Sequence, residues 1–206
     1  MKILVIEDSQ VHRDSAVKTL VGHELTLADS FEKGIKALST EINHEKLNRL
    51  SDERFGPCPS EHGDARVAWF DKRESLYDEC RNRPDFDAVL VDMMMPMSHE
   101  TLAPDAFYPG EQVPYGFVLA LRACQVGAKY VAMVTDTNHH KGAISAALDK
   151  IGSCYYQGVE PLFEINGAKV LFIHTPFVEG GEGAEKDWGR VLKHLVEGRA
   201  VKSRTQ

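Results

Sequence analysis

The chain has 206 residues, a formal net charge of −7 and a hydrophobic fraction of 43%, with 27% charged residues. These values are ordinary for a folded domain with a substantial core. The negative charge argues against nucleic acid as a partner of the whole surface, and no apolar run reaches the roughly 18 residues that a membrane span requires. Four scattered cysteines and a start without a signal-peptide pattern predict a cytoplasmic protein with reduced thiols.

The first third of the chain predicts alternating strands and helices. An apolar strand at 2–6 ends on two acidic residues, Glu7 and Asp8. The periodicity of the apolar residues that follow predicts, in order, a helix over about 9–20, a strand over 24–28 and a helix from 31 to about 42. A continuation of this last helix as far as residue 55 is left open.

A Pro/Gly-rich break at 55–64 interrupts this alternation and predicts a loop. After it, 66–70 fits either a strand or the start of a helix, and 72–81 is expected to be helical. The central feature of the chain comes next. Ala88–Val91 is an uninterrupted apolar run, which is typical of a strand buried on both faces. That run ends on one carboxylate, Asp92.

The second half of the chain begins with a long irregular stretch at 97–114, which contains three prolines. The Asn-Gly pair at 166–167, between two apolar runs, predicts a β-hairpin. The other expected elements are a helix over 117–126, a strand over 129–134 that ends on Thr135 and Asp136, a helix from about 138 to 151, a final amphipathic helix over 188–196 and a frayed basic tail at 199–206.

This alternation predicts a single α/β domain over 1–198, with a parallel sheet between helices and insertions at about 43–83, 98–113 and 153–166. Right-handed crossovers would bring the carboxyl ends of the strands to one rim. Carboxylates gathered there repel one another, so keeping them ionised requires a cation, and oxygen ligands favour magnesium. The residues expected at the rim are Glu7, Asp8, Asp92, Thr135 and Thr175.

Four segments together resemble the receiver domain of two-component response regulators, over about two thirds of the chain. They are ILVIEDS at 3–9, DAVLVDMMMPM at 87–97, VAMVTD at 131–136 and FIHTPF at 172–177. The resemblance implies a three-layer, flavodoxin-like fold around a doubly wound, parallel five-stranded sheet. It also implies phosphoryl transfer to the chain from a histidine kinase or a small phosphodonor, assisted by Mg²⁺.

The resemblance assigns roles to individual residues. Asp92 would be the phosphoacceptor, Thr135 the switch hydroxyl and Phe172 the switch aromatic. The metal would be held by Glu7, Asp8, Asp92 and the backbone carbonyl of Met94.

The chain departs from the family at two of these positions. Thr175 stands before Pro176, where the family has a lysine, and Asp136 stands after Thr135, where the family has a small residue. Loss of a close charge-assisted contact removes roughly 1.5–3 kcal/mol. A substitute cation is expected from the neighbouring segments, which offer His139, His140, His174 and Lys141.

Two functions therefore compete on the sequence alone. The first is an atypical receiver, a signalling switch whose only chemistry is to accept and lose a phosphoryl group on Asp92. The second is a pseudo-receiver that binds a protein partner without phosphorylation, through the insertions or the final helices. A metal-dependent hydrolase with His139 or His140 as general base has less support, because no nucleophile–base spacing stands out. The resemblance also allows a homodimer formed through the last strands and helices.

Overall fold

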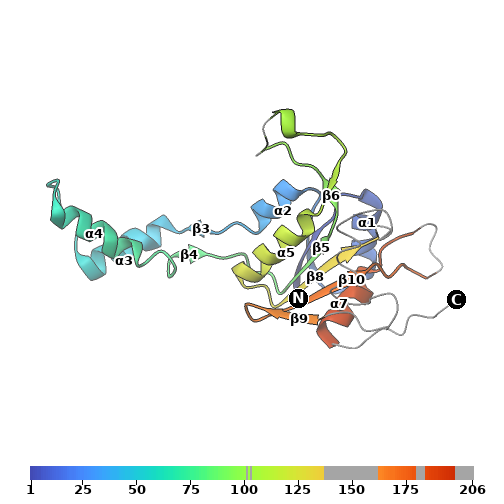
Figure 1. The fold of residues 1–206 in the computed structure, drawn as a ribbon. Coiled ribbons are helices and arrows are strands. Elements are labelled where there is room, and N and C mark those ends of the chain that lie inside the picture. Colours follow the sequence, from blue (N-terminus) through green and yellow to red (C-terminus); the bar gives the residue numbers. More distant parts are fainter. Residues whose placement is uncertain (101, 103, 137–161, 180–183, 198–206) are drawn as a thin grey trace. The chain divides into compact units, whose positions relative to one another are not determined.

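The computed structural model describes residues 1–100, 102, 104–136, 162–179 and 184–197 (Figure 1). The chain divides into two compact units. The larger one combines residues 1–38 with residues from 85 onward, and the smaller one is 39–84. Within the described residues, no helix is both long enough and apolar enough to cross a membrane.

The larger unit is built on a six-stranded sheet with the order β2-β1-β5-β8-β10-β9. All neighbouring strands run parallel except β9, which is antiparallel to β10. The strands are β1 (Lys2–Ile6), β2 (Glu24–Ala28), β5 (Ala88–Asp92), β8 (Tyr130–Thr135), β9 (Leu162–Ile165) and β10 (Ala168–His174). The chain is therefore an α/β protein with a mostly parallel central sheet, an arrangement compatible with a flavodoxin-like fold.

The observed sheet has six strands, one more than the five that were expected. The predicted hairpin forms, and its turn has positive φ at Asn166 (52°) and Gly167 (78°). This turn places β9 beside β10, so the hairpin extends the central sheet at one edge.

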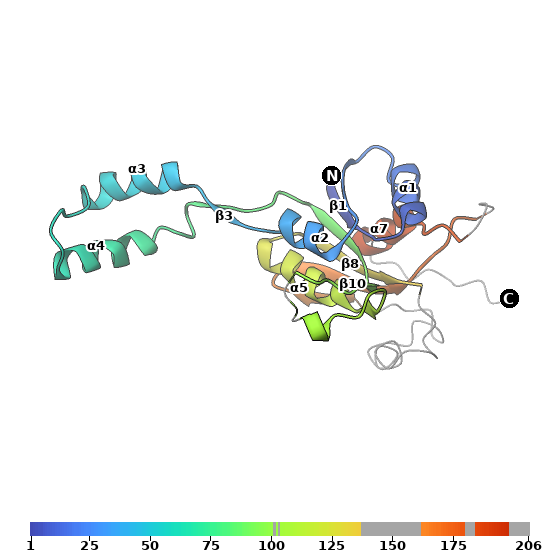
Figure 2. The same cartoon turned by 90° about the horizontal axis from the view of Figure 1, so that it is seen from above.

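Helices cover both faces of this sheet, as the view in Figure 2 shows. One face packs on α1 (Gln10–Thr19) and α7 (Trp188–Glu197) through a core that includes Ile3, Leu90 and Trp188. The other face packs on α2 (Phe31–Ala37) and α5 (Tyr115–Val126) through a core that includes Val91 and Leu119. Alternate side chains of β1 and β5 enter the two cores, which explains why these strands are apolar without interruption.

The start of α5 lies directly against the end of β5. The Gly116 N–H donates to the Met93 carbonyl at 3.0 Å, and a Cβ on Gly116 would come within 2.5 Å of the Asp92 carbonyl oxygen. Only glycine permits this approach. The segment before α5, expected to be irregular, holds a short antiparallel pair, β6 (Met95–Pro96) with β7 (Gln112–Val113), and a 3₁₀ turn, η1 (Pro104–Ala106).

The smaller unit contains two helices and a short antiparallel pair. Its elements are β3 (Glu41–Ile42), α3 (His44–Phe55), α4 (Asp64–Glu74) and β4 (Arg81–Asn82). A single helix from 31 to 55 is therefore wrong, because β3 pairs with β4 and the side chain of Asn43 caps a new helix. Residues 66–70 are helical, whereas the helix expected over 72–81 is also wrong, since α4 ends at Glu74. The predicted helix over 138–151 and the basic tail lie outside the described residues.

Candidate functional site

Three carboxylates meet where β1 and β5 end. The two strands are parallel neighbours with Ile6 opposite Val91, so the acids that follow these residues reach the same rim. Oxygen atoms of Glu7, Asp8 and Asp92 all lie within 4.8 Å of one another. Glu7 and Asp92 are buried and Asp8 is partly exposed. The structure thus brings together the acids that the sequence predicts at this rim.

A buried lysine, Lys186, joins this cluster and was not among the cations expected from the sequence. The Lys186 Nζ lies 2.7 Å from Glu7 Oε2 and 2.6 Å from Asp92 Oδ1, and its side chain is only 1% exposed. The expected substitute cations were His139, His140, His174 and Lys141. Among the described residues, Lys186 makes the ion pairs at the acids. The candidates His139, His140 and Lys141 lie outside the described residues.

The chain positions Lys186 by folding back after β10. Phe177 forms an antiparallel bridge with Lys186, and the Val178 N–H donates to the Glu185 carbonyl at 2.9 Å. Helix α1 fixes the lysine backbone from the other side, because Ser15 Oγ donates to the Lys186 carbonyl at 2.6 Å. A signal was present in the sequence, since Lys186 is the only lysine or arginine between Lys169 and Arg190.

Burial and mutual repulsion set the protonation of the cluster. Burial raises the pKa of Asp92 to about 8; the Lys186 ammonium opposes this effect and the charge of Glu7 adds to it. Burial also raises the pKa of Glu7, against the same ammonium. For Lys186, burial lowers the pKa, but Asp92 and Glu7 outweigh it and the net change is upward. One ammonium therefore does not fully balance the carboxylates, and a bound cation would favour their ionised forms.

The remaining oxygen atoms fit a small divalent cation. Both Glu7 oxygens are occupied, because Oε2 binds Lys186 and Oε1 accepts from the Ser9 N–H at 3.1 Å. Within the described part of the chain, Asp92 Oδ2 and the Asp8 carboxylate make no hydrogen bond or ion pair. These carboxylate oxygens are donors of the kind that Mg²⁺ prefers, and the resemblance would add the backbone carbonyl of Met94.

The two threonines of the predicted site lie at the ends of adjacent strands, Thr135 as the last residue of β8 and Thr175 directly after β10. Thr135 ends β8, is 6% exposed, and its carbonyl accepts from the Thr175 N–H at 2.8 Å. Thr175 is also buried, and its hydroxyl has no hydrogen-bond partner among the described residues. Asp136, which follows the first threonine, is half exposed, and its Oδ2 lies 3.5 Å from His12 Nε2.

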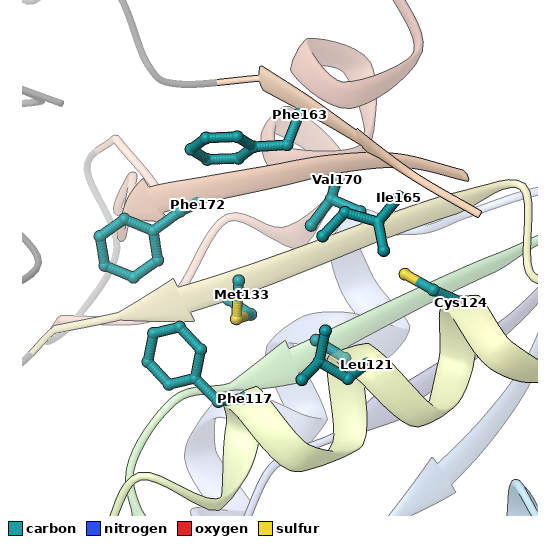
Figure 3. A pocket seen from close by; sticks show the side chains of 9 residues that line it. Phe117, Leu121, Cys124, Met133, Phe163, Ile165, Val170 and Phe172 are labelled. Atoms are coloured by element: carbon teal, nitrogen blue, oxygen red, sulfur yellow. The ribbon is translucent and has the colours of Figure 1, made fainter. Parts of the chain in front are cut away.

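Phe172 lies on the face of the sheet that α5 covers. Its ring borders an apolar cavity of about 260 Å³. Figure 3 shows Phe172 opposite Phe117 of α5, with Met133 of β8 between them and Phe163 of β9 beside the ring. The aromatic of the predicted switch therefore has free volume next to it.

Comparison with known proteins does not assign this chain to a family. No protein-family model matches the sequence, and the search of curated proteins finds no match. Any function must therefore be argued from the geometry at the rim.

Proposed function

We propose that this protein is a receiver-like signalling regulator that accepts a phosphoryl group on Asp92 with the assistance of Mg²⁺. The observation that supports this most strongly is the buried ion pair between Lys186 and Asp92, at 2.6 Å. The resemblance to receivers leaves the acceptor without its usual cation, because Thr175 stands at that position. Lys186 supplies that charge from a different part of the chain.

The proposed chemistry is phosphoryl transfer. A carboxylate oxygen of Asp92 attacks the phosphorus of a phosphohistidine or of acetyl phosphate, and an acyl phosphate forms. The donor's P–N or P–O bond breaks, and the leaving group keeps the electron pair. The imidazole of a phosphohistidine takes up a proton from solvent, whereas the acetate of acetyl phosphate leaves as the anion. Asp92 must be ionised to attack, and Lys186 stabilises that ionised form.

In this proposal, the metal ion and Lys186 each neutralise part of the negative charge at the phosphorylated site. Phosphorylation adds close to two negative charges beside Glu7 and Asp8. Mg²⁺, held by Asp8, Asp92 and the Met94 carbonyl, would neutralise charge on the phosphoryl oxygens. The Lys186 ammonium, held between Glu7 and Asp92, would offset one more negative charge of the phosphoryl group, and the protein itself supplies this cation.

Thr135 and Phe172 complete the proposed switch. The Thr135 hydroxyl would donate to a phosphoryl oxygen, because it ends the strand adjacent to the acceptor strand β5. The cavity beside Phe172 leaves room for its ring to change rotamer when β8 shifts. The proposed partner is a histidine kinase or another signalling protein, in the cytoplasm.

One observation favours the pseudo-receiver as a second candidate. The side chains of Lys186, Glu7 and Asp92 are only 1%, 1% and 7% exposed and already form a closed ion-pair network. Such a network can hold the rim in one conformation without phosphorylation. In that case the protein would act as a constitutive binding module.

Acetyl phosphate and beryllofluoride distinguish the two functions. With Mg²⁺, we expect a phosphoryl adduct by intact mass and bound beryllofluoride by ¹⁹F NMR, both abolished in Asp92→Asn. The matched control is Asp85→Asn, because the Asp85 side chain is 85% exposed and pairs with Lys2 at the surface. If the wild type gives no adduct, no bound fluoride and no Mg²⁺ binding, the pseudo-receiver is the correct description.

A further inference from the structure

We propose that Lys186 transmits the state of Asp92 to the face formed by α1 and α7, and that this face is the responsive surface of the protein. This inference rests on the proposed function, since it needs a change at Asp92 to transmit. The arms 177–178 and 185–186, which carry Lys186, belong to the same surface.

The side chain of Lys186 is the group that would respond directly to a change at Asp92. Its ammonium is shared between Glu7 Oε2 and Asp92 Oδ1; Glu7 directly follows β1, and Asp92 is the last residue of β5. A phosphoryl group on Asp92 brings anionic oxygens to one side of that ammonium and draws it away from Glu7. Because the lysine is buried, it cannot relax into solvent, and its displacement must reach the backbone.

The backbone of Lys186 is fixed to α1 on both sides of the residue. Its carbonyl accepts from Ser15 Oγ at 2.6 Å, and its N–H donates to His12 Nδ1 at 3.4 Å. Ser15 is fully buried, so this contact does not exchange with water. A shift of the lysine backbone therefore changes hydrogen bonds to α1.

Helix α7 begins immediately after this point. Asp187 caps it, because its Oδ1 accepts from the Arg190 N–H at 2.9 Å. Trp188 is fully buried, its Nε1 donates to the His12 carbonyl at 2.9 Å, and its ring lies 5.6 Å from the Lys186 Nζ. The first turn of α7 is thus coupled to Lys186 in three ways. It follows Lys186 directly in the chain, it is capped by the neighbouring Asp187, and its Trp188 ring lies near the Lys186 ammonium.

Helices α1 and α7 are neighbours on this face of the sheet (Figure 2), and their backbones approach closely at Gly189. A Cβ on Gly189 would come within 2.3 Å of the Thr19 carbonyl oxygen, so α7 lies against the end of α1 with no room for a side chain. Such close packing transmits small displacements as rigid movements of whole elements. The α1–α7 face should respond to Asp92 as one unit.

Hydrogen exchange of the full chain, with and without Mg²⁺ and beryllofluoride, tests this inference. We expect amides in 10–20 and 185–197 to exchange about fivefold to tenfold faster in the bound state, the effect of losing one hydrogen bond. Ser15→Ala removes the contact to the Lys186 carbonyl but leaves the charged cluster intact. It should still bind beryllofluoride by ¹⁹F NMR while the response of 185–197 is lost.

The control is Lys18→Met, which removes an exposed ion pair with Glu185 on the same surface. This variant should respond as the wild type does. If fluoride binds but the exchange response is confined to 95–126, or is unchanged in Ser15→Ala, the transmission through Lys186 is refuted while the proposed function survives. If no fluoride binds to the wild type, both the proposed function and this inference fail.

Discussion

Replacing Lys186 with methionine should destabilise the protein strongly and in a pH-dependent way. The substitution keeps most of the buried volume and removes the ammonium that contacts Glu7 at 2.7 Å and Asp92 at 2.6 Å. Removing one partner of a buried ion pair costs about 3–5 kcal/mol, because the other charge stays buried without compensation. Here two carboxylates lose the same partner, so the cost at pH 8 should lie at the upper end of that range.

The sign of the pH dependence follows from Asp92. Its pKa is raised from 3.8 to about 8, so between these values the folded protein holds a proton that the unfolded chain has released. This contribution to stability is greatest below pH 3.8 and is lost as the pH rises through about 8. Without Lys186 the pKa of Asp92 rises further, so the variant should lose stability more steeply with pH than the wild type.

Urea unfolding at about pH 5 and pH 8 measures this effect. Lys18→Met is the matched control, because its ion pair with Glu185 is exposed and should contribute only about 0–1 kcal/mol. Adding Asp92→Asn to Lys186→Met should restore part of the loss at pH 8, because one of the two uncompensated carboxylates is then absent. If Lys186→Met and Lys18→Met have equal free energies of unfolding at pH 8, the buried network does not exist in solution.

The remaining predictions concern the metal, the approach of α5 and the environment of α7. Mg²⁺ affinity, measured by calorimetry, should rise with pH up to about 8, because the ion displaces the proton of Asp92; a pH-independent affinity would contradict this. Asp8→Asn should weaken Mg²⁺ binding by tenfold or more. Gly116→Ala should lower the free energy of unfolding by about 1–3 kcal/mol, since its Cβ would meet the Asp92 carbonyl oxygen at 2.5 Å, and an unchanged melting temperature would show that the contact relaxes freely. In Trp69→Phe, Trp188 is the only tryptophan, and its fluorescence should change when Mg²⁺ and beryllofluoride bind; a constant spectrum despite bound fluoride would argue against displacement of Lys186.

The sequence by itself determined the strands of the central sheet and the acids at their ends. Short apolar runs such as Ala88–Val91 are typical of strands buried on both faces of a parallel sheet. Once β1 and β5 are neighbours, Glu7 and Asp92 must approach each other, because the acids directly follow or end these strands. Local patterns and the handedness of crossovers were sufficient for this part.

Only the tertiary structure decided which cation balances those acids. Lys186 reaches them because the chain folds back after β10 and is fixed to α1 by Ser15, and neither contact leaves a periodic pattern in the sequence. The sequence predicted the hairpin that contains β9, but only the structure shows that β9 joins the central sheet as a sixth strand. Electrostatic compensation acts through distance in the folded chain, so a charge supplied from a distant segment becomes visible only when the backbone path is known.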